Sequence, residues 1–131
     1  MSREQLTENF YRDEFACNDG KCEYCGGAAP MAMLLVDGVQ LLRNKLKAAG
    51  YAHVIVVSSG YRCLLYNMAI GSNDKSQHPK GCAADIHVKG VPIYIMLEFA
   101  LEIPQFENGG IGVYEWGLHL DTRGHRARWE G

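Results

Sequence analysis

The chain has 131 residues, a length typical of one domain, with 47% hydrophobic and 21% charged residues. This composition is that of a globular protein and excludes a largely disordered chain. The net charge of −2 gives no indication of a nucleic-acid or membrane-surface partner, and we expect a monomer. The longest apolar run, MAMLLV, is too short to insert across a membrane. The polar, acidic start MSREQLTENFYRDEF contains no signal peptide, so we expect synthesis in the cytoplasm.

The predicted elements alternate between helices and strands. Residues 1–29 are polar and loop-rich, and we assign them to the same single domain, 1–131. A helix is expected from Pro30 to Gly50, because MAMLLVDGVQLLRNKLKAAG has apolar residues at helical spacing and ends in glycine. The β-branched run HVIVVSSG predicts a buried strand at 53–58. LLYNMAIG predicts a short helix that ends at Gly71.

The second half of the chain adds the remaining elements. CAADIHV predicts a strand, and VPIYIMLEFALEI predicts a helix that begins at Pro92. GGIGVYEWGLHLDTR predicts one or two strands with a break near Gly117. The mixture of elements indicates an α+β domain with a small antiparallel sheet flanked by helices.

Three of the five cysteines fall in the stretch CNDGKCEYC, namely Cys17, Cys22 and Cys25. Their spacing is compatible with three corners of a zinc knuckle, with Cys63 or Cys82 as the fourth ligand. The alternative is a set of reduced cytosolic thiols. The sequence favours thiols over a structural zinc, because no second paired cluster follows.

The stretch SQHPKGCAADIH contains possible metal ligands, His78 and Asp85. The intervening Pro-Lys-Gly predicts a type I turn, and a strand–turn–strand path could bring the imidazole and the carboxylate together. Asp85 and His87 share one face of the strand that follows. A histidine beside a turn is more commonly a solvated surface residue.

The stretch GLHLDTR offers a third ligand. Leu118 and Leu120 alternate with His119 and Asp121, which places the polar pair on one face of a strand. A structural histidine is the more common finding at such a position. Taken together, however, His78, Asp85 and His119 are the ligand types of a catalytic zinc site, which keeps a fourth position open.

Four stretches in this order give a specific resemblance. They are SSGYRC…YN (58–67), SQHPKGCAADI (76–86), GGIGVYEWGLHLDTR (109–123) and the closing RARW, and EFAC near the N-terminus adds to them. The chain resembles the zinc D-Ala-D-Ala carboxypeptidase family of peptidoglycan peptidases, which includes vancomycin-resistance dipeptidases and phage endolysins and shares a fold with the hedgehog signalling domain. The family pattern Ser-x-His-x-x-Gly-x-Ala-x-Asp is matched at every defined position from Ser76 to Asp85.

The resemblance implies roles for individual residues. The zinc ligands would be His78, Asp85 and His119, binding one catalytic Zn²⁺. Arg62 would lie beside the metal, where its fork of donors suits a carboxylate or an oxyanion. Ser76 would support the substrate or a contact next to the ligands. Tyr61, like Tyr66, would line the pocket or pack in the core.

The general base is less defined. In several branches of the family, an acidic residue or a histidine lies two or three residues before the last ligand, where this chain has Gly117 and Trp116. Glu115 is four residues from His119, about 13 Å along a straight strand, so it can serve only if the chain bends at Gly117. Asp121 lies about 7 Å from His119 along the strand, and it would orient a ligand or act as the base. Further candidates are His87 and His125.

The resemblance implies a zinc-dependent metallopeptidase that hydrolyses peptidoglycan stem peptides with zinc-activated water. Release of the terminal D-Ala from a D-Ala-D-Ala end is the expected reaction, with an endopeptidase cut within the stem as the next choice. Such a protein could reach the cell wall after phage-type release. The alternative is a catalytically inactive, zinc-stabilised domain of the same fold that binds the cell wall or belongs to a phage structure.

Overall fold

Within residues 3–73 and 75–131, which the computed structural model describes, a five-stranded sheet organises the fold. The spatial order is β1-β2-β4-β3-β5. The strands are β1 (Val56–Ser59), β2 (Ala83–His87), β3 (Gly110–Tyr114), β4 (Gly117–Asp121) and β5 (Ala127–Glu130). The expected α+β class is confirmed. The sheet is antiparallel except that β3 and β5 are parallel, which differs from the expected antiparallel sheet.

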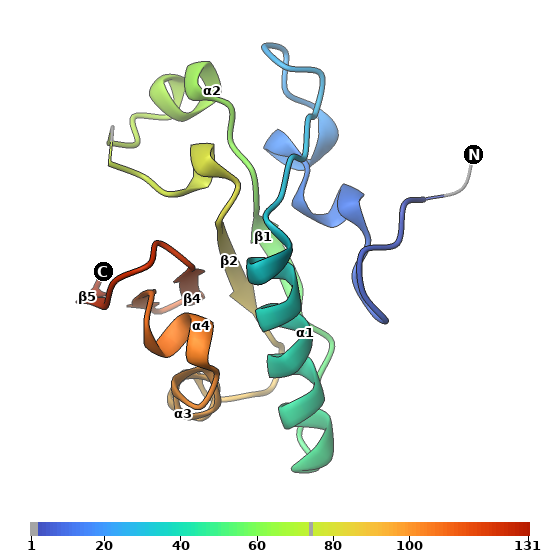
Figure 1. The fold of residues 1–131 in the computed structure, drawn as a ribbon, viewed down its shortest axis with the longest axis vertical. Helices are drawn as coiled ribbons and strands as arrows, with labels where there is room; N and C mark the ends of the chain where they lie inside the picture. Colours follow the sequence, from blue (N-terminus) through green and yellow to red (C-terminus); the bar gives the residue numbers. More distant parts are fainter. Residues whose placement is uncertain (1–2, 74) are drawn as a thin grey trace.

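Three helices cover one face of the sheet. They are α1 (Met33–Ala48), α3 (Ile93–Leu101) and α4 (Pro104–Glu107), and Figure 1 shows them on the same side of the strands. The contact between α1 and α4 is close, because a Cβ at Gly38 would lie 2.6 Å from the ring of Phe106. The remaining helix, α2 (Leu64–Ala69), packs against the 3-10 turn His78–Lys80.

Alternation along the strands separates the core from the polar face. Ile86 on β2 and Leu118 and Leu120 on β4 are fully buried in the core beneath the helices. Asp85 and His119, the neighbours of these residues along the strands, point to the opposite face because successive side chains alternate. The helix layer thus stabilises the sheet by hydrophobic burial, and the other face is available for polar chemistry.

Two strands differ from their predictions. The buried strand expected at 53–58 is the edge strand β1, and Val54 and Val56 remain 67% and 45% exposed. A run of β-branched residues predicts a strand but does not distinguish an edge strand from a central strand of the sheet. The strand β5 was not predicted, because its partner β3 lies far away in the sequence.

The first 29 residues are largely irregular in the described part of the chain, with two 3-10 turns, Arg12–Phe15 and Cys17–Gly20. Phe10 and Phe15 are buried in the core and attach this segment to the rest of the fold. The backbone N–H of Tyr61 donates to the Phe15 carbonyl at 2.8 Å. Among residues 3–73 and 75–131, no helix has the length and hydropathy that crossing a membrane requires.

Candidate metal centre

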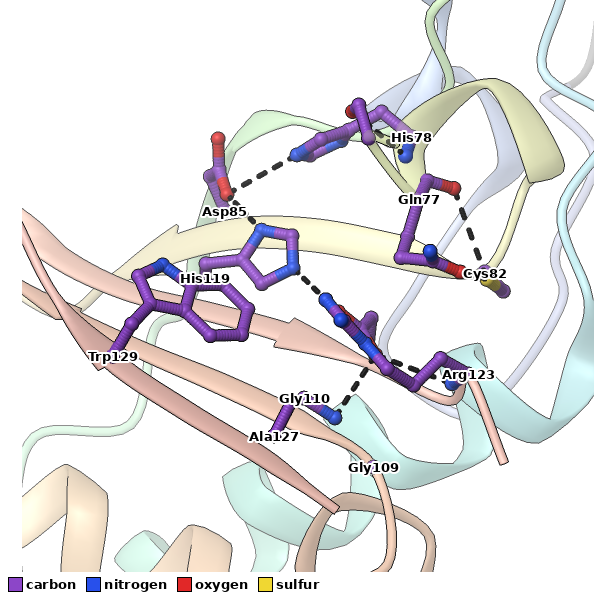
Figure 2. A network of polar contacts seen from close by, with 12 residues as sticks. Gln77, His78, Cys82, Asp85, Gly109, Gly110, His119, Arg123, Ala127 and Trp129 are labelled. Atoms are coloured by element: carbon purple, nitrogen blue, oxygen red, sulfur yellow. Dashed lines mark hydrogen bonds and ion pairs between the residues drawn. The ribbon is translucent and has the colours of Figure 1, made fainter. Parts of the chain in front are cut away.

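Three side chains that are distant in the sequence meet on the polar face of the sheet. The Oδ1 atom of Asp85 lies 3.3 Å from His78 Nε2 and 3.0 Å from His119 Nδ1. Figure 2 shows Asp85 between the two imidazoles. The ligand-type atoms of the three residues all lie within 4.8 Å of one another, and all three groups have little exposure to solvent.

Strand register and one tight turn create this meeting point. Asp85 on β2 is directly opposite His119 on β4, which places their side chains side by side. His78 enters from the 3-10 turn His78–Lys80, where the Gly81 N–H donates to the His78 carbonyl at 3.1 Å. Gly81 has φ +70°, and a Cβ there would clash with the carbonyl oxygen of Pro30. The Pro-Lys-Gly turn predicted from the sequence is therefore present, and glycine is required at its end.

Each histidine is held by its second ring nitrogen. His78 Nδ1 donates to the Gly60 carbonyl at 2.7 Å, which leaves Nε2 facing Asp85. His119 Nε2 contacts Asp121 Oδ2 at 2.7 Å, which leaves Nδ1 facing Asp85. Hydrogen bonds of this kind fix the tautomer and the orientation of metal-binding imidazoles.

The charges around His119 favour a cation at this position. Burial alone would lower the pKa of His119, but the carboxylates of Asp121 and Asp85 outweigh it and raise the pKa above its usual value. Burial alone would raise the pKa of Asp85, but the contacts with His119 and His78 hold it well below its usual range. The two carboxylates therefore favour a positive charge at this point of the site.

The donor set fits a zinc ion. Two imidazole nitrogens and a carboxylate oxygen are the ligands of a catalytic zinc site with an open fourth position. A tetrahedron with bonds of about 2.0–2.1 Å has edges of about 3.3–3.4 Å. The distances of 3.0 and 3.3 Å from Asp85 to the two histidines are close to such edges.

Arg62 lies next to the three ligand-type residues. Its Nη2 atom is 3.3 Å from Asp85 Oδ2, the carboxylate oxygen that faces away from the histidines. Its Nε atom donates to Ser59 Oγ at 3.0 Å, and its Nη1 atom is 3.4 Å from the Oδ1 atom of the buried Asn67. These contacts fix the guanidinium beside Asp85, with a side-chain exposure of 15%.

A cavity of about 530 Å³ opens above these groups. The residues lining it include the predicted Arg62, Ser76, His78, Asp85 and His119. The remaining lining residues have no role predicted from the sequence; they are Ser72, Asn73, Lys75, Gln77, Tyr114, Trp116, Arg123 and Trp129. Several of these lie within stretches quoted for the family resemblance, and the closing RARW was the available signal for Trp129.

Because Gly112 has no side chain, the Trp129 ring fits beside His119. Gly112 lies between His119 and Trp129 in the strand register, and a Cβ there would clash with the indole. The Trp129 ring packs with its centroid 5.1 Å from that of His119. Its Nε1 donates to the Tyr114 hydroxyl at 2.8 Å, so that β5 closes one side of the site.

The structure does not bring Glu115 to the three ligand-type residues. The chain does bend where the sequence argument required, because Tyr114 pairs with Gly117 across a two-residue turn. The bend stacks Trp116 on Tyr114, with ring centroids 4.8 Å apart, and leaves Glu115 exposed. Glu115 is not among the described residues that line the cavity.

The other predicted residues occupy distinct positions. The Ser76 hydroxyl accepts the His78 N–H at 3.3 Å and lines the cavity. Tyr61 packs against the hydrophobic core and not against the cavity, which favours the packing role for it. Asp121 is fully buried and makes an ion pair with Arg123 at 2.7 Å.

The contacts of Asp121 are those expected of a residue that orients His119. Its two oxygens contact only donors: the N–H of Gly110, the ring of His119, and the backbone and guanidinium of Arg123. Burial alone would raise the pKa of Asp121, but the contacts with His119 and Arg123 lower it. A carboxylate at this position therefore stays ionised and keeps Nδ1 of His119 directed at Asp85.

Replacing Asp121 by asparagine is expected to weaken zinc binding by about 10–100-fold and to cost about 3 kcal/mol of stability. In the wild type, both carboxylate oxygens of Asp121 accept from N–H donors. The NH₂ group of asparagine cannot accept, so in either orientation of the amide it would face one of these donors. Zinc titration against a chelating dye and urea unfolding measure the two effects. The exposed Asp37 on α1 provides the matched control, Asp37→Asn. Unchanged zinc affinity in Asp121→Asn would refute the positioning role.

Two imidazoles and one carboxylate beside an arginine, at an open cavity, are the kinds of groups found in the sites of metal-dependent hydrolases. The model of the peptidase M15 family matches residues 8–121 of the chain. The chain therefore belongs to the peptidase M15 family, which is a zinc-dependent metallopeptidase family of the D-Ala-D-Ala carboxypeptidase type. No curated protein matches the chain. The family resemblance predicted from the sequence is confirmed.

Proposed function

We propose that this protein is a zinc D,D-carboxypeptidase that removes the terminal D-Ala from peptidoglycan stem peptides. The observation that carries the proposal is the meeting of His78, Asp85 and His119 beside Arg62 at an open cavity. Family membership supports the peptidase chemistry. The resemblance of the motifs to D-Ala-D-Ala carboxypeptidases supports the substrate class.

In this proposal His78, Asp85 and His119 would hold the zinc ion through the ring nitrogens and the carboxylate oxygen that face one another. When bound, zinc supplies a Lewis acid that polarises a scissile carbonyl and activates water. Gly60 and Asp121 keep the two imidazoles oriented through their outer ring nitrogens. The guanidinium of Arg62 stabilises the negative charge that develops on the substrate oxygen.

The charge of the cavity favours an exopeptidase over an endopeptidase. Arg62, Lys75 and Arg123 line the cavity, whereas Asp85 is the only carboxylate among its described lining residues. Because Asp121 neutralises Arg123 and Asp85 pairs with Arg62, Lys75 is the cation among the described lining residues that is left to attract an anionic substrate. The free carboxylate of a peptide C-terminus is the group that such a cation binds.

A pair of substrates tests this specificity. A stem pentapeptide that ends in D-Ala-D-Ala and the same peptide with a C-terminal amide differ only in the charged carboxylate. We expect kcat/KM to be at least about 10-fold higher for the free acid, because a charge-assisted contact is worth about 1.5–3 kcal/mol. Equal cleavage of both peptides, or a cut within the stem, would favour the endopeptidase alternative.

One observation favours a second candidate function. Within the described residues that line the cavity, no carboxylate other than Asp85 is present to move a proton from water to the leaving amine. A domain of this fold that keeps the metal but lacks turnover would bind the cell wall or a phage component. Binding of muropeptides without any product, measured on the zinc-loaded protein, would support this candidate.

Replacing Glu115 by glutamine is expected to leave kcat and kcat/KM unchanged within about twofold, because the side chain is exposed at the hairpin turn and away from the cavity lining. Steady-state cleavage of the D-Ala-D-Ala pentapeptide measures this. Glu98 is also exposed, lies on α3 and is not among the residues lining the cavity, so Glu98→Gln is the matched control. A loss of about 100-fold or more in kcat for Glu115→Gln alone would restore Glu115 as the general base.

A further inference from the structure

Four cysteines from two separate segments form a second cluster of possible metal ligands. Cys17, Cys22 and Cys25 come from the N-terminal segment, and Cys63 comes from the connection between β1 and α2. Their four Sγ atoms all lie within 4.8 Å of one another, and all four are free thiols. The sequence left Cys63 and Cys82 open as the fourth member, and the structure selects Cys63.

The spacing of the sulfurs matches a tetrahedral metal site. A zinc ion with four Zn–S bonds of about 2.3 Å separates the sulfurs by about 3.8 Å. Cys22 Sγ and Cys63 Sγ are 3.7 Å apart. This distance is much longer than the S–S bond of a disulfide, about 2.05 Å. Four cysteines are the ligand set of closed, structural zinc sites.

The backbone around the sulfurs is arranged as in a thiolate site. Backbone N–H groups point at three of them: Cys63 N at Cys17 Sγ (3.3 Å), Ala28 N at Cys25 Sγ (3.4 Å) and Tyr66 N at Cys63 Sγ (3.4 Å). Such donors stabilise the thiolates that a metal requires. Between Cys22 and Cys25 the chain makes a tight turn, and the Gly26 N–H donates to the Cys22 carbonyl at 2.9 Å.

The cysteines also account for order in a segment that has few other contacts with the rest of the fold, among them the Tyr66 hydroxyl, which donates to Asn18 Oδ1 at 3.1 Å. Residues 16–29 include only the 3-10 turn Cys17–Gly20, and Asn18 and Asp19 within it have positive φ angles of 48° and 53°. Cys17 and Cys22 are the only buried residues of this segment. Burial of two thiols supplies little hydrophobic stabilisation, whereas a structural zinc supplies enough to fold a loop of this kind.

We propose that Cys17, Cys22, Cys25 and Cys63 bind a structural zinc ion that fastens the N-terminal segment to the β1–α2 connection, which carries Arg62. This inference reverses the sequence-based preference for unmetallated thiols, and it stands independently of the proposed function. Its site is coupled to the His/Asp site through the chain. Arg62 directly precedes Cys63. The Gly60 carbonyl accepts from His78 Nδ1, and Gly60 lies so close to the Phe15 backbone that a Cβ at Gly60 would be 2.6 Å from it.

Metal content and a cobalt spectrum test the proposal. We expect about two zinc ions per chain in the protein purified under reducing conditions, and about one in Cys22→Ser and in His78→Ala. The matched control is Cys82→Ser, because Cys82 lies outside the cluster and its thiol contacts Gln77; it should keep both ions. Cobalt-loaded protein should show strong thiolate-to-cobalt charge-transfer absorption, retained in His78→Ala and lost in Cys22→Ser.

Limited proteolysis of the wild-type chain avoids any dependence on how the cysteine variants fold. Lys21 is exposed between Cys17 and Cys22, so a chelator that strips the ion should increase trypsin cleavage after Lys21 by about 10-fold or more. Added zinc should reverse the effect. Three results would each overturn the proposal. They are a wild-type content of one zinc per chain that is lost in His78→Ala, the absence of charge-transfer absorption, and a disulfide between cluster cysteines.

Discussion

Replacing His78 by alanine is expected to remove the zinc ion of the His/Asp site and to reduce peptide hydrolysis by about 10³-fold or more. The imidazole is 3% exposed, its Nδ1 is occupied by the Gly60 carbonyl, and its Nε2 faces Asp85. Without it, two protein donors remain, fewer than zinc sites use. Zinc analysis of the purified variant and product formation from a stem pentapeptide measure the two effects.

The matched control for His78 is His53, which precedes β1 and contacts the Tyr51 carbonyl at 3.2 Å. His53→Ala should retain the metal content and turnover of the wild type. Zinc content and hydrolysis that both survive in His78→Ala would contradict the metal centre derived from the structure. Loss of zinc with hydrolysis retained would show that the peptidase chemistry does not use this metal.

Replacing Arg62 by lysine is expected to lower kcat by about 10²–10³-fold, or about 3–4 kcal/mol of transition-state stabilisation, and to leave zinc bound. Lysine retains the charge but cannot contact Ser59, Asn67 and Asp85 at once, as the guanidinium does. Because the lost contact forms mainly with the developing negative charge, KM should change much less than kcat.

A purely structural ion pair between Arg62 and Asp85 makes a different prediction. It would lower the thermal stability of Arg62→Lys and leave kcat unchanged, since the Nη2 to Asp85 distance is 3.3 Å and the pair is largely shielded from solvent. Arg43→Lys is the matched control, because Arg43 donates to the His53 carbonyl and is not among the residues lining the cavity. Thermal melts and steady-state kinetics of both variants separate the two roles.

The family resemblance implied the residues of the candidate metal centre, and local sequence patterns indicated part of their geometry. Pro-Lys-Gly sets the turn that presents His78, and alternation along β2 and β4 places Asp85 and His119 on one face. Three of the four helices and four of the five strands were predicted from local sequence patterns for the same reason, whereas α4 and β5 were not. These patterns depend on residues that are close together in the chain.

The features that were missed depend on long-range contacts. Trp129 reaches His119 because β5 pairs in parallel with β3 and because Gly112 leaves space for the indole. Cys63 lies beside three cysteines from the N-terminal segment. The sequence could not distinguish Cys63 from Cys82 as the fourth cysteine, because that depends on where β1 lies relative to the N-terminal segment. Glu115 is exposed and is not among the described residues that line the cavity, because a glycine that allows a bend does not determine which side chain turns inward; its role as the base stays a prediction.

Incubation of the zinc-loaded protein with a stem pentapeptide that ends in D-Ala-D-Ala, followed by mass spectrometry of the products, tests the central claim most directly. The account predicts free D-Ala and the matching tetrapeptide, formed by the wild-type protein and not by His78→Ala. An intact pentapeptide after prolonged incubation, with zinc still held by His78, Asp85 and His119, would contradict it. That result would assign the metal centre to a binding domain that does not catalyse hydrolysis.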